Sequence, residues 1–176
     1  MTDAQTAHHY GVLSDPTTLT IRRLLTAGID RVWAYLTESD LRRKWFAAGD
    51  MPAHVGDAIE LVWRNNELTY PPGRAPEGAG DENRMQTRIT ELDPPRRLAI
   101  AWGDGDVTFD LAEQDGGVLL TLIHTGITDR AKLMNFAPGW HMHLDLLQAR
   151  LANTTPEAFW DGIARLKKDY AERLAS

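Results

Sequence analysis

Apolar and polar residues alternate along six stretches of this chain, with the period of two expected for half-buried strands. The first stretch covers residues 17–27, and the others cover residues 58–64, 84–92, 96–103, 106–113 and 117–126. Short turn signals rich in Gly, Pro and Asp link the last four stretches. Links this short join antiparallel neighbours, because a parallel crossover needs about a dozen residues or more. The pattern predicts a curved antiparallel sheet of about six strands.

Four segments show helical periodicity instead. Two short helices are expected between the first and second strands, with Asp30 as the N-cap of one and Ser39 or Asp40 as the N-cap of the other. Two further helices close the chain, and the final one is expected to begin with Thr155 as N-cap and Pro156 at its first position. The apolar stripes of these two helices are Trp140, Leu144, Leu147 and Leu151, and Phe159, Ile163, Leu166 and Tyr170.

This order of elements predicts an α+β fold in which the sheet wraps around a long C-terminal helix. Residues 1–15 show no periodicity and are expected to form a flexible N-terminal arm. The domain itself is expected over residues 16–153, followed at 154–176 by an additional amphipathic helix packed on the domain or at an interface. A cavity is expected wherever the side chains of sheet and helix do not meet.

Composition and charge narrow the functions. The absence of cysteine removes disulfides, thiolate metal sites and cysteine nucleophiles, and it agrees with a cytoplasmic location. The net charge of -6 and the scattered cations argue against nucleic acid as a partner, and the short basic groups at 22–23, 42–44 and 167–168 are expected on solvated faces. No signal peptide or membrane-spanning run is recognised, so no membrane partner is expected. Nucleotide-binding loops, serine-hydrolase elbows and metalloprotease motifs are also missing from the sequence.

Several motifs occur in a characteristic order. They are Trp45-Phe46, Gly56-Asp57, Pro94-Pro95-Arg96-Arg97-Leu98 leading to Trp102, Leu119-Leu120-Thr121-Leu122 with His124, and Gly139-Trp140. In this order they resemble the bacterial homologues of the heat shock protein 90 ATPase activator, members of the START-like (SRPBCC) superfamily. The resemblance implies a helix-grip fold with an internal cavity. Eukaryotic relatives that stimulate the chaperone pair this domain with a second one, for which this chain has no room, so chaperone activation is not expected.

Large aromatic side chains are more numerous than a small core requires, and such rings also line pockets for flat or apolar ligands. The candidate ligand-binding residues are Trp45, Phe46, Glu60, Trp63, Trp102, Phe109, His124, Trp140, His141 and Leu144. Glu60 is either an inward carboxylate paired with Arg64 or a residue of the solvated sheet face. His141 and His143 lie about 200° apart on a helix and cannot chelate one ion, so neither a metal site nor a cofactor is expected.

Three hypotheses of function stay open at this point. The first is a protein that binds a small hydrophobic or amphipathic ligand in the internal cavity. The second is a cyclase or hydratase, a type found in the same superfamily, with His124 and a carboxylate as acid and base; the alternative for His124 is a satisfied histidine at a strand end. The third is a co-chaperone-like interaction module that uses the solvent face of the last helix, which could instead form a homodimer. The link at 65–83 is either a lid or disordered.

Overall fold

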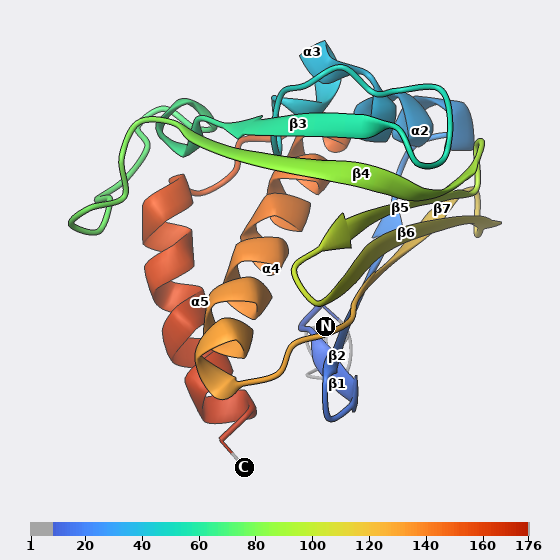
Figure 1. Ribbon diagram of the computed structural model, residues 1–176. Coiled ribbons are helices and arrows are strands. Elements are labelled where there is room, and N and C mark those ends of the chain that lie inside the picture. The colour runs from blue at the N-terminus through green and yellow to red at the C-terminus, as the bar shows by residue number, and fades with distance from the viewer. Residues whose placement is uncertain (1–8, 176) are drawn as a thin grey trace.

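The computed structural model of the protein describes residues 9–175 and contains a seven-stranded antiparallel sheet (Figure 1). The strand order is β1-β2-β7-β6-β5-β4-β3, so consecutive strands from β3 to β7 pair with one another and β2 pairs with β7. The strands are β1 (Val12–Asp15), β2 (Thr18–Leu25), β3 (Ala58–Trp63), β4 (Asn83–Asp93), β5 (Arg97–Trp102), β6 (Gly105–Gln114) and β7 (Gly117–His124). The predicted antiparallel meander is confirmed, with one strand more than expected.

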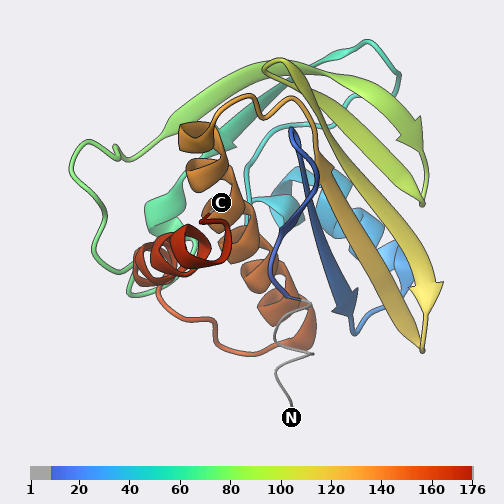
Figure 2. The same ribbon diagram turned by 90° about the horizontal axis from the view of Figure 1, so that it is seen from below.

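The helices complete a helix-grip arrangement. They are α2 (Ile29–Thr37), α3 (Ser39–Arg42), the single 3₁₀ turn η1 (Asn65–Glu67), α4 (Arg130–Ala152) and α5 (Phe159–Arg173). The sheet curves around α4, and α5 packs on the side of α4 that faces away from β2 and β7 (Figures 1 and 2). The predicted α+β fold with a long C-terminal helix inside a curved sheet is therefore confirmed.

Helix α4 begins ten residues before the first residue of its predicted stripe. Asp129 caps it, because the Asp129 carboxylate accepts a hydrogen bond from the Lys132 backbone N–H at 2.8 Å. Its middle is buried on every side, with five consecutive buried residues from Trp140 to Leu144. Its first ten residues bury only Leu133, Ala137 and Pro138, so this part of the helix gave no periodic signal.

Strand β1 lies in the segment expected to be a flexible arm. Val12 pairs with Thr20 and Leu13 with Leu19, which adds β1 to the edge of the sheet beside β2. All four residues of β1 are exposed, so the sequence carries no alternation there. The part of the expected arm before residue 9 lies outside the described residues.

The two short helices start earlier than predicted. Gly28 caps α2 and Glu38 caps α3, so the predicted caps Asp30, Ser39 and Asp40 lie within the first turns. Asp30 and Asp40 still favour these helices, because negative side chains interact well with the positive N-terminal end of a helix.

Helix α5 starts later than predicted because the link between β3 and β4 supplies its first hydrogen-bond acceptors. The Phe159 backbone N–H donates to Thr69 Oγ1 at 2.9 Å, and the Trp160 N–H donates to the Pro72 carbonyl at 2.9 Å. The residue predicted as the cap, Thr155, is exposed and lies outside the helix. The link at 65–83 is thus attached through residues 69–74 to the N-terminal end of α5.

Replacing Thr69 with Ala removes the side-chain acceptor of the Phe159 N–H. We expect the free energy of unfolding to fall by about 1 kcal/mol, as for the loss of a helix cap. Urea denaturation of Thr69→Ala beside Thr155→Ala measures this, since the second variant removes the cap expected from sequence. A larger loss in Thr155→Ala than in Thr69→Ala would contradict the assignment.

Two arginines expected on solvated faces are buried. The Arg23 side chain has no exposed surface and forms an ion pair with Asp145 at 3.0 Å. The Arg42 guanidinium donates to the carbonyl oxygens of Ala47 at 3.0 Å and Leu36 at 3.2 Å, and burial lowers the pKa of Arg42 to about 10. Arg23 joins β2 to α4, which is far away in the sequence, and Arg42 binds carbonyl groups at the end of α2. A short basic run does not reveal either role.

Candidate functional site

The space between the sheet and α4 is filled by aromatic side chains. The rings of Trp45 and Phe46 stack with centroids 5.3 Å apart, and Trp45 meets Phe109 edge-on at 6.4 Å. Phe109 in turn contacts Trp140 of α4 at 5.9 Å. The void left beside Trp45, Phe46 and Phe109 has a volume of about 10 Å³, room for one water at most. The side chains that were expected to line an internal cavity therefore fill that space instead.

An open pocket lies where this aromatic cluster reaches the surface, between α4 and the last residues of β3 and β5. We call it the aromatic pocket; its volume is about 120 Å³. The Trp102 ring lies 5.9 Å from that of Trp63 and 5.3 Å from that of Trp140, and Phe46 stacks on Trp140 at 5.0 Å. Its lining comprises Phe46, Trp63, Trp102, Asn135, Phe136, Gly139, Trp140 and His143. Four of the predicted ligand-binding residues meet here: Phe46, Trp63, Trp102 and Trp140.

His124 lies directly behind the wall of the aromatic pocket. Its ring contacts Phe136 at 4.5 Å and Trp102 at 5.7 Å, and its Nδ1 accepts a hydrogen bond from Trp140 Nε1 at 3.0 Å. Because an indole N–H can only donate, Nδ1 carries no proton and the neutral ring is protonated at Nε2. Burial lowers the pKa of His124 to about 4, so the ring is neutral near pH 7.

His143 lines the pocket from α4 and was not among the predicted ligand-binding residues. Its Nδ1 lies 2.8 Å from the Trp45 carbonyl oxygen, which can only accept, so Nδ1 carries the proton and Nε2 is a free acceptor site. Burial lowers the pKa of His143 to about 4. The two histidines thus hold opposite tautomers, both neutral at physiological pH.

Three predicted ligand-binding residues lie elsewhere. Glu60 faces the outer side of the sheet, where its carboxylate pairs with Arg84 at 2.7 Å. Leu144 is fully buried and belongs to the core. His141 points toward α5, where its Nδ1 lies 2.9 Å from the Tyr170 hydroxyl. Desolvation lowers the pKa of His141 to about 2, and the positive charge of Arg23 contributes to the shift.

The chemistry that His124 could support is limited by these contacts. Its ring is surrounded by Trp102, Phe136 and Trp140, and among residues 9–175 no carboxylate forms an ion pair with it. The same part of the chain holds no group of three His, Asp or Glu side chains placed to bind a metal ion.

None of the helices in residues 9–175 combines the length and the apolar character that a membrane span requires.

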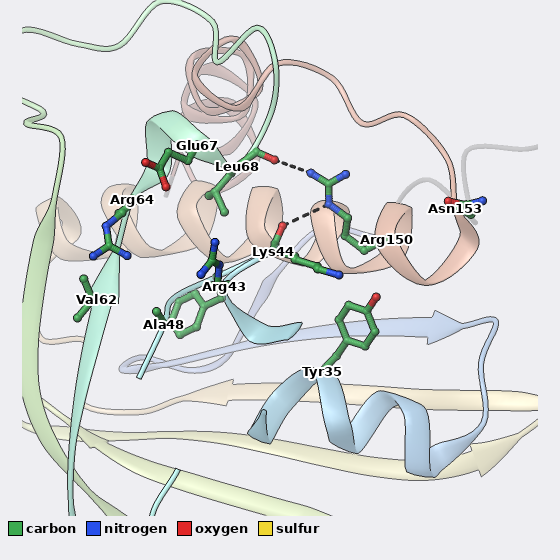
Figure 3. A pocket seen from close by; sticks show the side chains of 11 residues that line it. Tyr35, Arg43, Lys44, Ala48, Val62, Arg64, Glu67, Leu68, Arg150 and Asn153 are labelled. Carbon is green, nitrogen blue, oxygen red and sulfur yellow. Dashed lines mark hydrogen bonds between the residues drawn. The ribbon is translucent and has the colours of Figure 1, made fainter. Parts of the chain in front are cut away.

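A second, larger pocket lies on the other side of the segment that carries Phe46, and we call it the basic pocket (Figure 3). Its volume is about 460 Å³. Four cationic side chains enter it from three parts of the chain: Arg43 and Lys44 after α3, Arg64 after β3, and Arg150 from α4. The rest of the lining comprises Tyr35, Phe46, Ala48, Val62, Glu67, Leu68 and Asn153.

The family of the chain follows from its sequence. The model of the family described as Activator of Hsp90 ATPase homolog 1-like protein matches residues 26–152, from the link after β2 to the end of α4. The chain belongs to this family. The predicted resemblance to the bacterial members of the START-like superfamily is therefore confirmed. No curated protein matches the sequence.

Solved structures agree with membership of the Hsp90-activator homologue family. The solution structure of a Bordetella parapertussis protein is 35% identical in sequence, with a TM-score of 0.79 over 93% of this chain and 90% of that chain. The crystal structure of CalU16 from Micromonospora echinospora is 24% identical, with a TM-score of 0.63 over 90% of this chain and 88% of that chain. A Rhodobacter sphaeroides protein, also 24% identical, has a TM-score of 0.61 over 81% of this chain and 97% of that chain. The last two show a shared fold.

Within this family's fold, the sequence reasoning missed the residues that α4 and the links bring to the pockets. His143 lies on the same face of α4 as Trp140, three residues further along, and that spacing could have identified it. Arg43, Lys44 and Arg150 had no such signal, because more than a hundred residues separate the two parts of the chain that carry them.

Proposed function

We propose that this member of the Hsp90-activator homologue family binds a small molecule by taking one planar ring of it into the aromatic pocket. The observation that supports this most is an open pocket whose walls are the rings of Phe46, Trp63, Trp102, Phe136 and Trp140. Rings in this arrangement present both faces and edges to a ligand, which suits another aromatic ring. Trp63 and Trp102 are each only partly buried, so their surfaces are accessible to a ligand.

The size of the pocket limits the ligand. Engineered apolar cavities of about 150 Å³ bind benzene, so a pocket of about 120 Å³ takes a single ring or a short alkyl group. A pocket that encloses a drug-sized ligand has about 300 Å³ or more. The remainder of a larger ligand would therefore lie outside, over the rim formed by Asn135 and Gly139.

Polar groups at the pocket can orient the ring. His143 offers an acceptor nitrogen at Nε2, since its other nitrogen donates to the Trp45 carbonyl. The exposed Asn135 offers an amide donor and acceptor at the rim. A ring that carries a hydroxyl group, such as a phenol, matches an acceptor of this kind better than an unsubstituted hydrocarbon.

Indole N–H signals in an NMR titration with phenol test the proposal. Trp63, Trp102 and Trp140 line the pocket, whereas Trp33 on α2 and Trp160 on α5 do not, so the protein contains its own reference signals. We expect phenol to shift the signals of the first three residues only. Trp102→Leu should weaken phenol binding about tenfold, the effect of losing roughly 1.4 kcal/mol of contact.

The matched control is Trp33→Leu, which removes a partly buried indole away from the pocket. It should leave phenol affinity unchanged while changing stability. Equal weakening in both variants, or shifts spread over Trp33 and Trp160, would show that phenol binds nonspecifically and would contradict the proposal.

The proposal also covers the location of the protein, catalysis by His124 and the formation of a homodimer. The lack of cysteine supports a cytoplasmic location. Acid-base catalysis by His124 gains no support, because its Nδ1 is occupied by Trp140 and the lowered pKa leaves no titration near neutral pH. The buried stripe of α5, which includes Phe159, Leu166 and Tyr170, packs on its own domain. A homodimer would therefore use the exposed side of that helix or another surface.

A further inference from the structure

We infer that the basic pocket is a binding site for a dianionic group, a phosphate monoester carried on a small organic molecule. The site is separate from the aromatic pocket, since the lining of the two shares only Phe46. The inference about the basic pocket therefore does not depend on the function proposed for the aromatic pocket.

The charges in the basic pocket are not balanced by the protein. Arg43 and Lys44 form no ion pair with any described residue, and Arg150 donates only to carbonyl oxygens, of Leu68 at 2.6 Å and Lys44 at 3.3 Å. Arg64 is neutralised by Glu82 at 2.9 Å. Glu67 is the one carboxylate in the lining.

Three unbalanced cations and one carboxylate leave the pocket with a charge of about +2, on a protein whose net charge is -6. A phosphate monoester carries about -1.5 to -2 near pH 7, which matches this excess, whereas a carboxylate carries half as much. Arginine is suited to phosphate because its planar guanidinium donates two parallel hydrogen bonds.

One of the donors, the Arg150 guanidinium, is already held in place. The two carbonyl contacts of Arg150 fix its guanidinium between η1 and the segment after α3, and its remaining Nη1 makes no hydrogen bond to a described residue. Figure 3 shows the Lys44 ammonium and the Tyr35 hydroxyl on the side of the pocket where Arg150 lies, with the Arg150 guanidinium directed toward the Leu68 carbonyl. A site whose donors are positioned before binding loses less free energy on ordering.

The rest of the lining indicates the size and nature of the ligand. The volume of about 460 Å³ exceeds what a phosphate group needs and lies in the range of sites that enclose small organic molecules. Ala48, Val62 and Leu68 supply an apolar wall beside the cations. The site therefore fits a phosphate group attached to a small, partly apolar body.

Titration of the folded protein with methyl phosphate tests the inference, followed by backbone amide NMR at constant ionic strength. We expect saturable shifts at Lys44, Leu68 and Arg150. The variant Arg43→Ala/Lys44→Ala should bind methyl phosphate at least about tenfold more weakly. The control Lys167→Ala/Lys168→Ala makes the same change of net charge on the exposed side of α5 and should bind as the unmodified protein does.

Equal weakening in the two double variants would mean that only long-range charge acts, and it would overturn the site. Shifts that do not saturate, or that spread evenly over the surface cations, would also overturn it. Acetate serves as the singly charged comparison: binding at least as tight as that of methyl phosphate would overturn the assignment to a dianion. Tryptophan signals of the aromatic pocket should not move with methyl phosphate, which separates this result from the phenol titration.

Discussion

The free energy of unfolding should fall by about 6 kcal/mol between pH 7 and pH 5, because three buried histidines stay neutral in the folded protein. Burial lowers the pKa of His124 and His143 to about 4, and desolvation with the charge of Arg23 lowers that of His141 to about 2. In the unfolded chain each titrates near pH 6.5, so the unfolded state binds more protons below that pH. Each histidine then costs about 2 kcal/mol at pH 5.

The direction of this effect follows from the lowered pKa values. The contribution of these histidines is fully present above pH 6.5 and is lost as the pH falls toward the folded pKa values. Below pH 4, His124 and His143 protonate in the folded protein too, and their contribution stops changing. The pKa of Asp145, whose Oδ2 lies 3.5 Å from His141 Nε2, is raised by burial, so this carboxyl group changes the stability in the opposite direction.

Urea denaturation at pH 7, 6 and 5 measures the effect, with two single variants as tests. His124→Gln keeps an acceptor for the Trp140 N–H but cannot titrate, so it should reduce the pH slope by about one third. His54→Gln makes the same substitution at a side chain that is 82% exposed and serves as the surface comparison. A stability that does not change between pH 7 and pH 5 would show that the buried histidines titrate normally.

The fold could be predicted to the extent that burial on one face leaves a periodic signal. In β7, Val118, Leu120, Leu122 and His124 are buried at alternate positions, and the same alternation is visible in the sequence. Strand β1 has no buried residue, and the first ten residues of α4 bury only Leu133, Ala137 and Pro138, so neither segment produced a period. The signal was thus absent where a segment buries few side chains.

The candidate site could be predicted only as a class of residues. The aromatic residues were correctly expected to lie together, and the alternation of β3 already placed Glu60 on the face opposite Ile59 and Leu61. Whether the rings line a cavity or fill it depends on how Trp45 of one link, Phe109 of β6 and Trp140 of α4 fit together. The fit depends on the combined volume of side chains from three segments that are distant in the sequence, and no local sequence pattern reports that volume.

The second large effect should come from the ion pair between Arg23 of β2 and Asp145 of α4. The Arg23 side chain is fully buried; its Nη2 lies 3.0 Å from Asp145 Oδ1, and its Nε donates to Gln148 Oε1 at 2.9 Å. Asp145→Leu leaves the guanidinium buried without its counter-charge. We expect the free energy of unfolding to fall by about 3 kcal/mol, the usual cost of breaking one side of a buried ion pair.

Asp169→Leu is the comparison, because Asp169 of α5 pairs with Arg165, whose side chain is 46% exposed; Asp169 also accepts a hydrogen bond from the Tyr10 hydroxyl at 2.8 Å. Exposed pairs contribute up to about 1 kcal/mol, so this variant should lose much less stability. The double variant Arg23→Met/Asp145→Leu removes both charges and should recover most of the loss, since two apolar side chains need no counter-charge. If the double variant were as unstable as the sum of the two single variants, the cost would lie in packing and not in the unpaired charge.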